Sequence, residues 1–400
     1  MTDTSVERKQ RQPGRIKFLL NHPLSTYYLI GGASVLLLLL GLVMVLSASS
    51  IESFKTFGSS YTLAGRQALF GIGGLVGLYF AARTSVQFWR GIARWLAIGA
   101  LALLVIVLVI GVAVAGQRNW IELFGPFRIQ PSEFAKIALV VWGADQLARK
   151  ETYYREWKEL LAPIVPVAGL FMILVLMEGD FGNTLMLAAI LCGMLFAAGV
   201  PGRFFALFAG IGVLATWALT LAAPYRMERI TSWLDQSSDP LGVGWQLTQG
   251  YYALGTGGIL GVGLGASREK WGALPEAHTD FIFTVIGEEL GLIGTVSVLL
   301  LFAVLAFAIF RLSRTTKDPF VRISTAGVGC WIVVQAIINI GAVLGLLPIT
   351  GVPLPFVSYG GSSLVPALAA IGMLLCFARN EPGARQSLRR RATARSLARR

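Results

Sequence analysis

The chain has 400 residues, of which 55% are hydrophobic and only 14% are charged, and its mean hydropathy is +0.68. Soluble domains carry about 25% charged residues, so the composition excludes an ordinary soluble protein. The net charge of +13 does not indicate nucleic-acid binding, because the basic residues concentrate in alternate loops and at the two ends. The three cysteines, Cys192, Cys330 and Cys376, lie far apart within apolar runs and indicate no disulfide or metal framework.

Residues 1–26 are polar and basic, and Pro13 and Gly14 break any helix there, so a basic cytoplasmic tail is predicted. The first apolar run ends in Ser47, Ala48 and Ser49, which is similar to a signal-peptide cleavage site. The run is longer than the 7–15 apolar residues, roughly, of a signal peptide, and further apolar runs follow it. An uncleaved first helix is therefore predicted.

The sequence predicts an all-α polytopic membrane protein with about ten transmembrane helices, since each apolar run can cross a hydrocarbon core of about 30 Å. The runs lie at residues 27–49, 63–82, 94–115, 132–148, 161–177, 183–200, 203–223, 281–310, 323–346 and 359–378. The charge distribution places both termini in the cytoplasm and the long loop 224–280 outside. Residues 27–378 thus form the membrane domain, and residues 379–400 form a second basic cytoplasmic tail.

Polar residues gather in the predicted outward loops. Residues 116–131 carry Arg118 and Trp120, and Lys136 follows about one helical turn inside the next span. A lysine there is costly unless it is paired, and Glu288 or Glu289 is the expected partner. Glu178, Gly179 and Asp180 form a further turn, and residues 347–356 contain three prolines that prevent a helix.

The long loop is too elaborate for a simple connection. Residues 242–252 predict a helix at the membrane interface, and six glycines between 255 and 265 allow a close backbone approach to a ligand. Charged and polar side chains then precede the eighth span: Arg268, Lys270, Glu276, His278 and Asp280. Polar chemistry is therefore expected at the mouth of a membrane helix.

Five motifs in this order resemble the SEDS family (shape, elongation, division, sporulation), the bacterial cell-wall glycosyltransferases of the FtsW and RodA type. The motifs are GPFRIQPSEFAK at 125–136, GDFGN at 179–183, YRMERI at 225–230, GTGGILGVGLGASREKWGALPEAHTDFIFTVIGEELG at 255–291 and GLLPITGVPLPFVSYGGSS at 345–363. The PEAHTDFIF form looks more like the division enzymes. Gly179 and Asn183 stand where relatives commonly have Pro and Thr.

The resemblance implies polymerisation of lipid II into a growing glycan strand at the outer face of the bacterial cytoplasmic membrane, in septal wall synthesis. It implies a class B penicillin-binding protein of the FtsI type as transpeptidase partner, together with other divisome proteins and membrane lipids. The essential aspartate of the family falls on Asp280. A carboxylate at the mouth of a membrane cavity can act as the general base for the attacking sugar hydroxyl. The structural alternative is that Thr279 or Asp280 caps the eighth span.

The other candidate residues are assigned to substrate binding. Basic side chains match the phosphate oxygens of the departing diphosphate, or serve as interfacial anchors: Arg226, Arg229, Arg268 and Lys270. Further expected substrate contacts are Glu276, His278, Trp120, Lys136 and Ser362. His278 also suits a solvated turn, and Trp120 an interfacial belt. A divalent cation such as Mg²⁺ or Mn²⁺ would assist the diphosphate, although no metal-ligand spacing is visible.

Two other functional classes remain open at this point. A flippase of lipid-linked precursors would expect charged residues through the bilayer midplane, whereas the acids here cluster at the outer face. A scaffold that only recruits a transpeptidase would not need a charged cleft. A RodA-type elongation polymerase is the alternative within the same chemistry. The sequence favours the glycosyltransferase.

Overall fold

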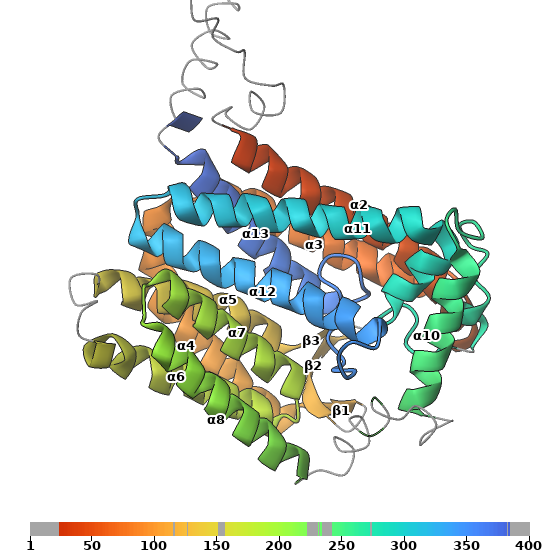
Figure 1. Ribbon diagram of the computed structural model, residues 1–400, viewed down its shortest axis with the longest axis horizontal. Coiled ribbons are helices and arrows are strands. Elements are labelled where there is room, and N and C mark those ends of the chain that lie inside the picture. Colours follow the sequence, from red (N-terminus) through yellow and green to blue (C-terminus); the bar gives the residue numbers. More distant parts are fainter. Residues whose placement is uncertain are drawn as a thin grey trace, which may run out of the picture.

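The computed structural model describes residues 24–114, 117–125, 127–150, 157–221, 231, 233, 242–272, 274–381, 383 and 384. Long helices occupy the predicted spans and lie side by side with their axes roughly aligned (Figure 1). They are α2 (Ser25–Phe57), α3 (Thr62–Arg83), α4 (Val86–Ile110), α5 (Pro131–Arg149), α6 (Trp157–Met177), α7 (Phe181–Ala197), α8 (Gly202–Leu221), α11 (Ile282–Thr315), α12 (Pro319–Val343) and α13 (Leu364–Arg379). The predicted class, an all-α polytopic membrane protein, is confirmed.

The helices differ in how well they suit a membrane. Among the described residues, six helices are long and apolar enough to cross a bilayer: α2, α3, α4, α11, α12 and the helix over residues 361–379. Shorter apolar stretches lie in α6, α7 and α8. Helix α5 carries Glu133 and Lys136 in its first turns. The count of ten spans therefore stays a prediction.

Local sequence signals explain where several helices begin. Asp180 caps α7 by accepting a hydrogen bond from the backbone of Asn183, and Asp318 caps α12 in the same way. Proline stands at the first position of α5 and of α12, where its missing N–H costs nothing. These caps satisfy backbone donors that have no partner within the helix.

The predicted outward loop 116–131 is in part a small antiparallel sheet, which the sequence did not predict. Its strands are β1 (Val112–Val114), β2 (Gln117–Phe124) and β3 (Phe127–Ile129), in the order β1-β2-β3. Gly125 has a φ of 55° in the tight connection between β2 and β3. The sheet lies beside the start of α5 and supplies side chains to the polar site described below.

The predicted interface helix is present as α10 (Val243–Gly257), which runs steeply across one end of the bundle (Figure 1). The segment after it lies against a break in α11 at Gly291, where φ is 65°. Backbone hydrogen bonds join the two, from Val262 N to Glu288 O (2.9 Å) and from Leu292 N to Gly258 O (2.9 Å). The glycine-rich segment thus approaches the backbone of α11. The sequence had predicted that these glycines allow an approach to a ligand.

Residues 344–360 fold back onto the bundle after α12. A Cβ atom on Gly41 of α2 would lie 2.5 Å from the carbonyl oxygen of Phe356, so only glycine allows this approach. This segment, the sheet β1–β3, α10 and the starts of α5, α7, α11 and α13 lie at the same end of the bundle (Figure 1). We call it the loop end.

Candidate functional site at the loop end

Asp280 lies in the turn immediately before α11 and is half-buried. The cap position of α11 falls on Phe281, which makes no side-chain cap bond, and the Thr279 hydroxyl donates to Glu276 Oε2 at 2.6 Å instead. Thr279, one of the two residues that the structural alternative named as a cap, therefore does not cap the helix. Asp280 lines a small pocket with Asn339, Thr350 and Gly351, among others. Asp280 is the titratable residue among those that line this pocket, so it is the candidate there for acid–base chemistry.

The buried amides of α12 connect this turn to the segment after α12. Asn339 Nδ2 donates to the carbonyl oxygens of Asp280 and Val352, both at 2.9 Å. Gln335 Nε2 donates to the carbonyl oxygen of Pro353 at 2.8 Å. Neither amide was predicted from the sequence to have a role, although two amides four residues apart in an apolar span are a visible signal.

Lys136 is fully buried and pairs within its own helix. Its Nζ atom lies 2.8 Å from Glu133 Oε1 and 3.5 Å from Gln335 Oε1, and 5.1 Å from the centre of the Trp331 ring. The predicted pairing with Glu288 or Glu289 is wrong. The nearer acid, one turn away on α5, satisfies the charge without a contact between distant helices. The predicted substrate contact of Lys136 stays a prediction.

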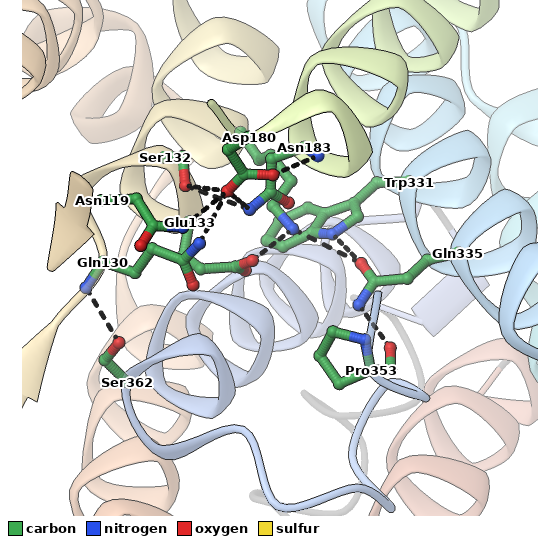
Figure 2. Close-up of polar contacts among 11 residues, drawn as sticks. Asn119, Gln130, Ser132, Glu133, Asp180, Asn183, Trp331, Gln335, Pro353 and Ser362 are labelled. Carbon is green, nitrogen blue, oxygen red and sulfur yellow. Dashed lines mark hydrogen bonds and ion pairs between the residues drawn. The ribbon is translucent and has the colours of Figure 1, made fainter. Parts of the chain in front are cut away.

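Asp180 is the centre of a second buried cluster, shown in Figure 2. Its Oδ2 atom accepts hydrogen bonds from neutral donors on three elements: Asn119, Gln130, Ser132 and Asn183. The backbone N–H of Gln130 also donates to Ser362 Oγ at 3.1 Å. The predicted site residue Ser362, in the turn before α13, is thus tied to the residue that follows β3, and the cluster links α5, α7 and this turn to the sheet.

Glu178 follows α6 beside this cluster, and its buried carboxyl oxygens accept or donate no hydrogen bond among the described residues. Burial, reinforced by the nearby Asp180 charge, raises the pKa of Glu178 from 4.5 to about 9. Its carboxyl group is therefore neutral at physiological pH, while Asp180 serves as the hydrogen-bond acceptor.

We expect Glu178→Gln to stabilise the protein at about pH 8 and to change little at about pH 4. Between 4.5 and about 9 the unfolded chain ionises Glu178 while the folded chain keeps the proton, so the free energy of unfolding falls as pH rises. At pH 7 the buried, protonated Glu178 lowers the free energy of unfolding by about 3 kcal/mol. Thermal unfolding in detergent at both pH values measures it. Glu159→Gln, an exposed site on α6, is the matched control, and equal shifts at both pH values would contradict the assignment.

The predicted basic residues fall into different environments. Arg268 is exposed, whereas Lys270 is buried and its Nζ contacts Glu289 Oε1 (3.1 Å), Gly265 O (2.7 Å) and Ser47 Oγ (3.2 Å). Lys270 therefore clamps the loop to α2 and α11, and it would have to leave these partners to bind phosphate. Arg226 and Arg229 lie outside the described residues.

His278 is buried beside Asp280, while Glu276 is exposed with a φ of 54°. The Nδ1 atom of His278 lies 3.3 Å from Glu52 Oε2, and its ring centre lies 5.4 Å from that of Tyr359. Arg66, at the start of α3, donates a hydrogen bond to the Tyr359 hydroxyl, and no role was predicted from the sequence for this basic residue. His278 is therefore packed, and not solvated as its alternative reading required. Trp120 is half-buried in β2 opposite Val112.

An apolar helical bundle with polar side chains gathered around a pocket at its loop end defines a polytopic membrane protein with a candidate functional site at that end. A family model described as a cell cycle protein, covering FtsW, RodA and SpoVE, matches residues 28–382. The chain therefore belongs to the FtsW/RodA/SpoVE family, as its motifs predicted.

Named relatives cover most of the chain. It is 42% identical over 372 residues to the "Probable peptidoglycan glycosyltransferase FtsW" of Mycobacterium tuberculosis, covering 92% of this chain and 71% of that protein. It is 40% identical over 344 residues to the stage V sporulation protein E of Bacillus subtilis, covering 86% and 94%.

Solved structures share the fold. The rod shape determining protein RodA of Thermus thermophilus matches with a TM-score of 0.66 and 27% identity, over 89% of this chain and 97% of that one. A chain from work described as "Structural coordination of polymerization and crosslinking by a peptidoglycan synthase complex" matches with a TM-score of 0.71 and 28% identity, over 91% and 99%.

Proposed function

We infer that this protein is a peptidoglycan glycosyltransferase. The observation that carries the inference is that Asp280 lines a pocket at the loop end, in a chain 42% identical to proteins named for that activity. The substrate proposed is lipid II, and the product is a glycan strand. The relatives named FtsW favour a septal role, in division.

The proposed chemistry is a glycosyl transfer in which the bond between the anomeric carbon of the donor sugar and the diphosphate breaks as the acceptor hydroxyl oxygen bonds to that carbon. Asp280 accepts the proton from the attacking sugar hydroxyl as the new glycosidic bond forms, and the lipid diphosphate leaves with a negative charge. The exposed Arg268 is proposed to bind that charge, with Arg226 and Arg229 as further proposed contacts. Glu276, His278, Trp120 and Ser362 stay predicted substrate contacts.

A divalent cation is a further expectation for the departing diphosphate. Within the described part of the chain, no group of three or more His, Cys, Asp and Glu side chains is arranged to hold a metal ion. If a cation takes part, we propose that the diphosphate itself supplies ligands to it. The polymerisation assay below, run with and without Mg²⁺ or Mn²⁺, tests this expectation.

The proposed partner is a class B penicillin-binding protein acting as transpeptidase. One structural neighbour belongs to a peptidoglycan synthase complex that couples polymerisation and crosslinking, which supports a partner of this kind. Because the loop end is proposed to face outward, it would meet the extracytoplasmic domain of such a partner. Both termini are proposed to lie in the cytoplasm, by the positive-inside rule.

The test is glycan polymerisation from purified lipid II by the purified protein, with and without a partner transpeptidase. We expect polymer, detected by its length on a gel. Precursor flipping in liposomes, measured in parallel, addresses the transporter alternative. Flipping without polymer under every partner condition would overturn the enzyme assignment. The absence of both flipping and polymerisation would favour a scaffold.

A further inference from the structure

We propose that Gln335 and Asn339 are positioning residues for Asp280, holding its backbone and the 350–353 segment in fixed register on α12. The proposal rests on the glycosyltransferase function inferred above and adds two residues to its site. Both side chains are about 3% exposed, although they stand in an apolar helix. Amides buried in such a place require a hydrogen-bonding reason.

The amide of Asn339 uses both its N–H donors on backbone oxygens from two different segments. One is the carbonyl of Asp280, which precedes α11, and the other is that of Val352, which follows α12. A planar amide group fixes the directions of both bonds. The backbone of Asp280 is therefore held relative to α12, and the wall of its pocket is held by the same side chain.

Gln335, one helical turn before Asn339 on α12, also binds a backbone carbonyl of the 350–353 segment. It lies four residues before Asn339, on the same face of α12. Its Nε2 atom holds the next carbonyl of the segment, that of Pro353, while its Oε1 atom accepts hydrogen bonds from Trp331 and Lys136 (Figure 2). Two consecutive carbonyls are thus bound by amides one turn apart, which fixes the register of the segment against the helix.

The pocket beside Asp280 shows why the register matters. Asn339, Thr350 and Gly351 line it together with Asp280, so a shift of the segment changes the pocket and the base at once. Asn339 Oδ1 is buried and meets no donor among the described residues.

A positioning role makes a kinetic prediction that a packing role does not. A general base must come within about 2.6–3.2 Å of the atom that carries the proton it removes. A misplacement of about 1 Å costs up to about 100-fold in rate. Loss of the amide donors is therefore expected to lower kcat while leaving the KM for lipid II nearly unchanged.

The variants for the test are Asn339→Leu, which keeps the side-chain size without donors, Asn339→Gln, which keeps the donors, and Gln335→Met. Asn380→Leu, at the other end of the bundle, is the matched control. We expect kcat to fall about 10- to 100-fold for Asn339→Leu, per folded protein, with KM within about twofold of wild type. Asn339→Gln should recover part of the loss, and Asn380→Leu should match wild type.

Thermal unfolding shows whether each variant is folded, and so whether a fall in kcat reflects positioning. If Asn339→Leu does not fold, the kcat of Gln335→Met is the test. An unchanged kcat in whichever of these variants folds overturns the positioning role, as does a loss that only follows the folded fraction. The outcome is distinct from failure of the proposed function. In that case wild-type protein makes no polymer, whereas here wild type is active and Asp280→Asn is not.

Discussion

Asp280→Asn is expected to lower the kcat of glycan polymerisation by at least about 100-fold and to leave the KM for lipid II close to its wild-type value. General bases contribute about 10²–10⁴-fold to rate, and an asparagine of the same size cannot accept the proton. The turn before α11 should persist, because Asn339 binds the backbone carbonyl of residue 280 and not its carboxylate. Single-turnover polymerisation of lipid II measures the loss.

The pH dependence of the polymerisation rate is a second test of the role of Asp280. If Asp280 is the base, the wild-type rate falls as pH drops and the carboxylate takes up a proton, and residual activity in Asp280→Asn lacks this acidic limb. Glu122→Gln is the matched control, since Glu122 is an exposed carboxylate on β2 at the same end of the molecule. Wild-type activity in folded Asp280→Asn would remove Asp280 from the mechanism.

The helical frame was readable from the sequence because membrane helices are defined by composition. A run such as 203–223 needs only apolar length to be recognised, and α8 spans Gly202–Leu221. The sheet β1–β3 was not predicted, since strands of three residues gain their stability from pairing across the sheet and not from local pattern. Asp280 was identified through its motif, while its hydrogen-bond environment depends on α12, far along the chain.

The partners of buried charges were the least predictable part of the site. Lys270 pairs with Glu289, nineteen positions away, because the glycine-rich segment folds back on the break in α11. The amino-acid composition does not predict that the glycine-rich segment folds back onto α11. The pair of Lys136 with Glu133 is different, since residues three apart on a helix are neighbours and the spacing was visible.

Lys136→Ala is expected to destabilise the protein by about 3–5 kcal/mol, because it leaves the buried Glu133 carboxylate without its cation. Lys136 is fully buried and Glu133 is 2% exposed, so water cannot replace the lost partner. The double variant Lys136→Met with Glu133→Gln removes both charges at similar volume and should recover most of the stability. Chemical or thermal unfolding in detergent compares the three proteins.

The double variant also separates the two roles open to Lys136. If its charge contacts the substrate, as the sequence predicts, polymerisation stays impaired in a protein whose stability has returned. Recovery of activity along with stability would assign the lysine to the architecture of α5 alone. The geometry makes the distinction sharp, because Lys136 also touches Gln335, which holds the carbonyl of Pro353. A loss transmitted through Gln335 should then match Gln335→Met in kcat, whereas a loss of substrate contact should raise KM.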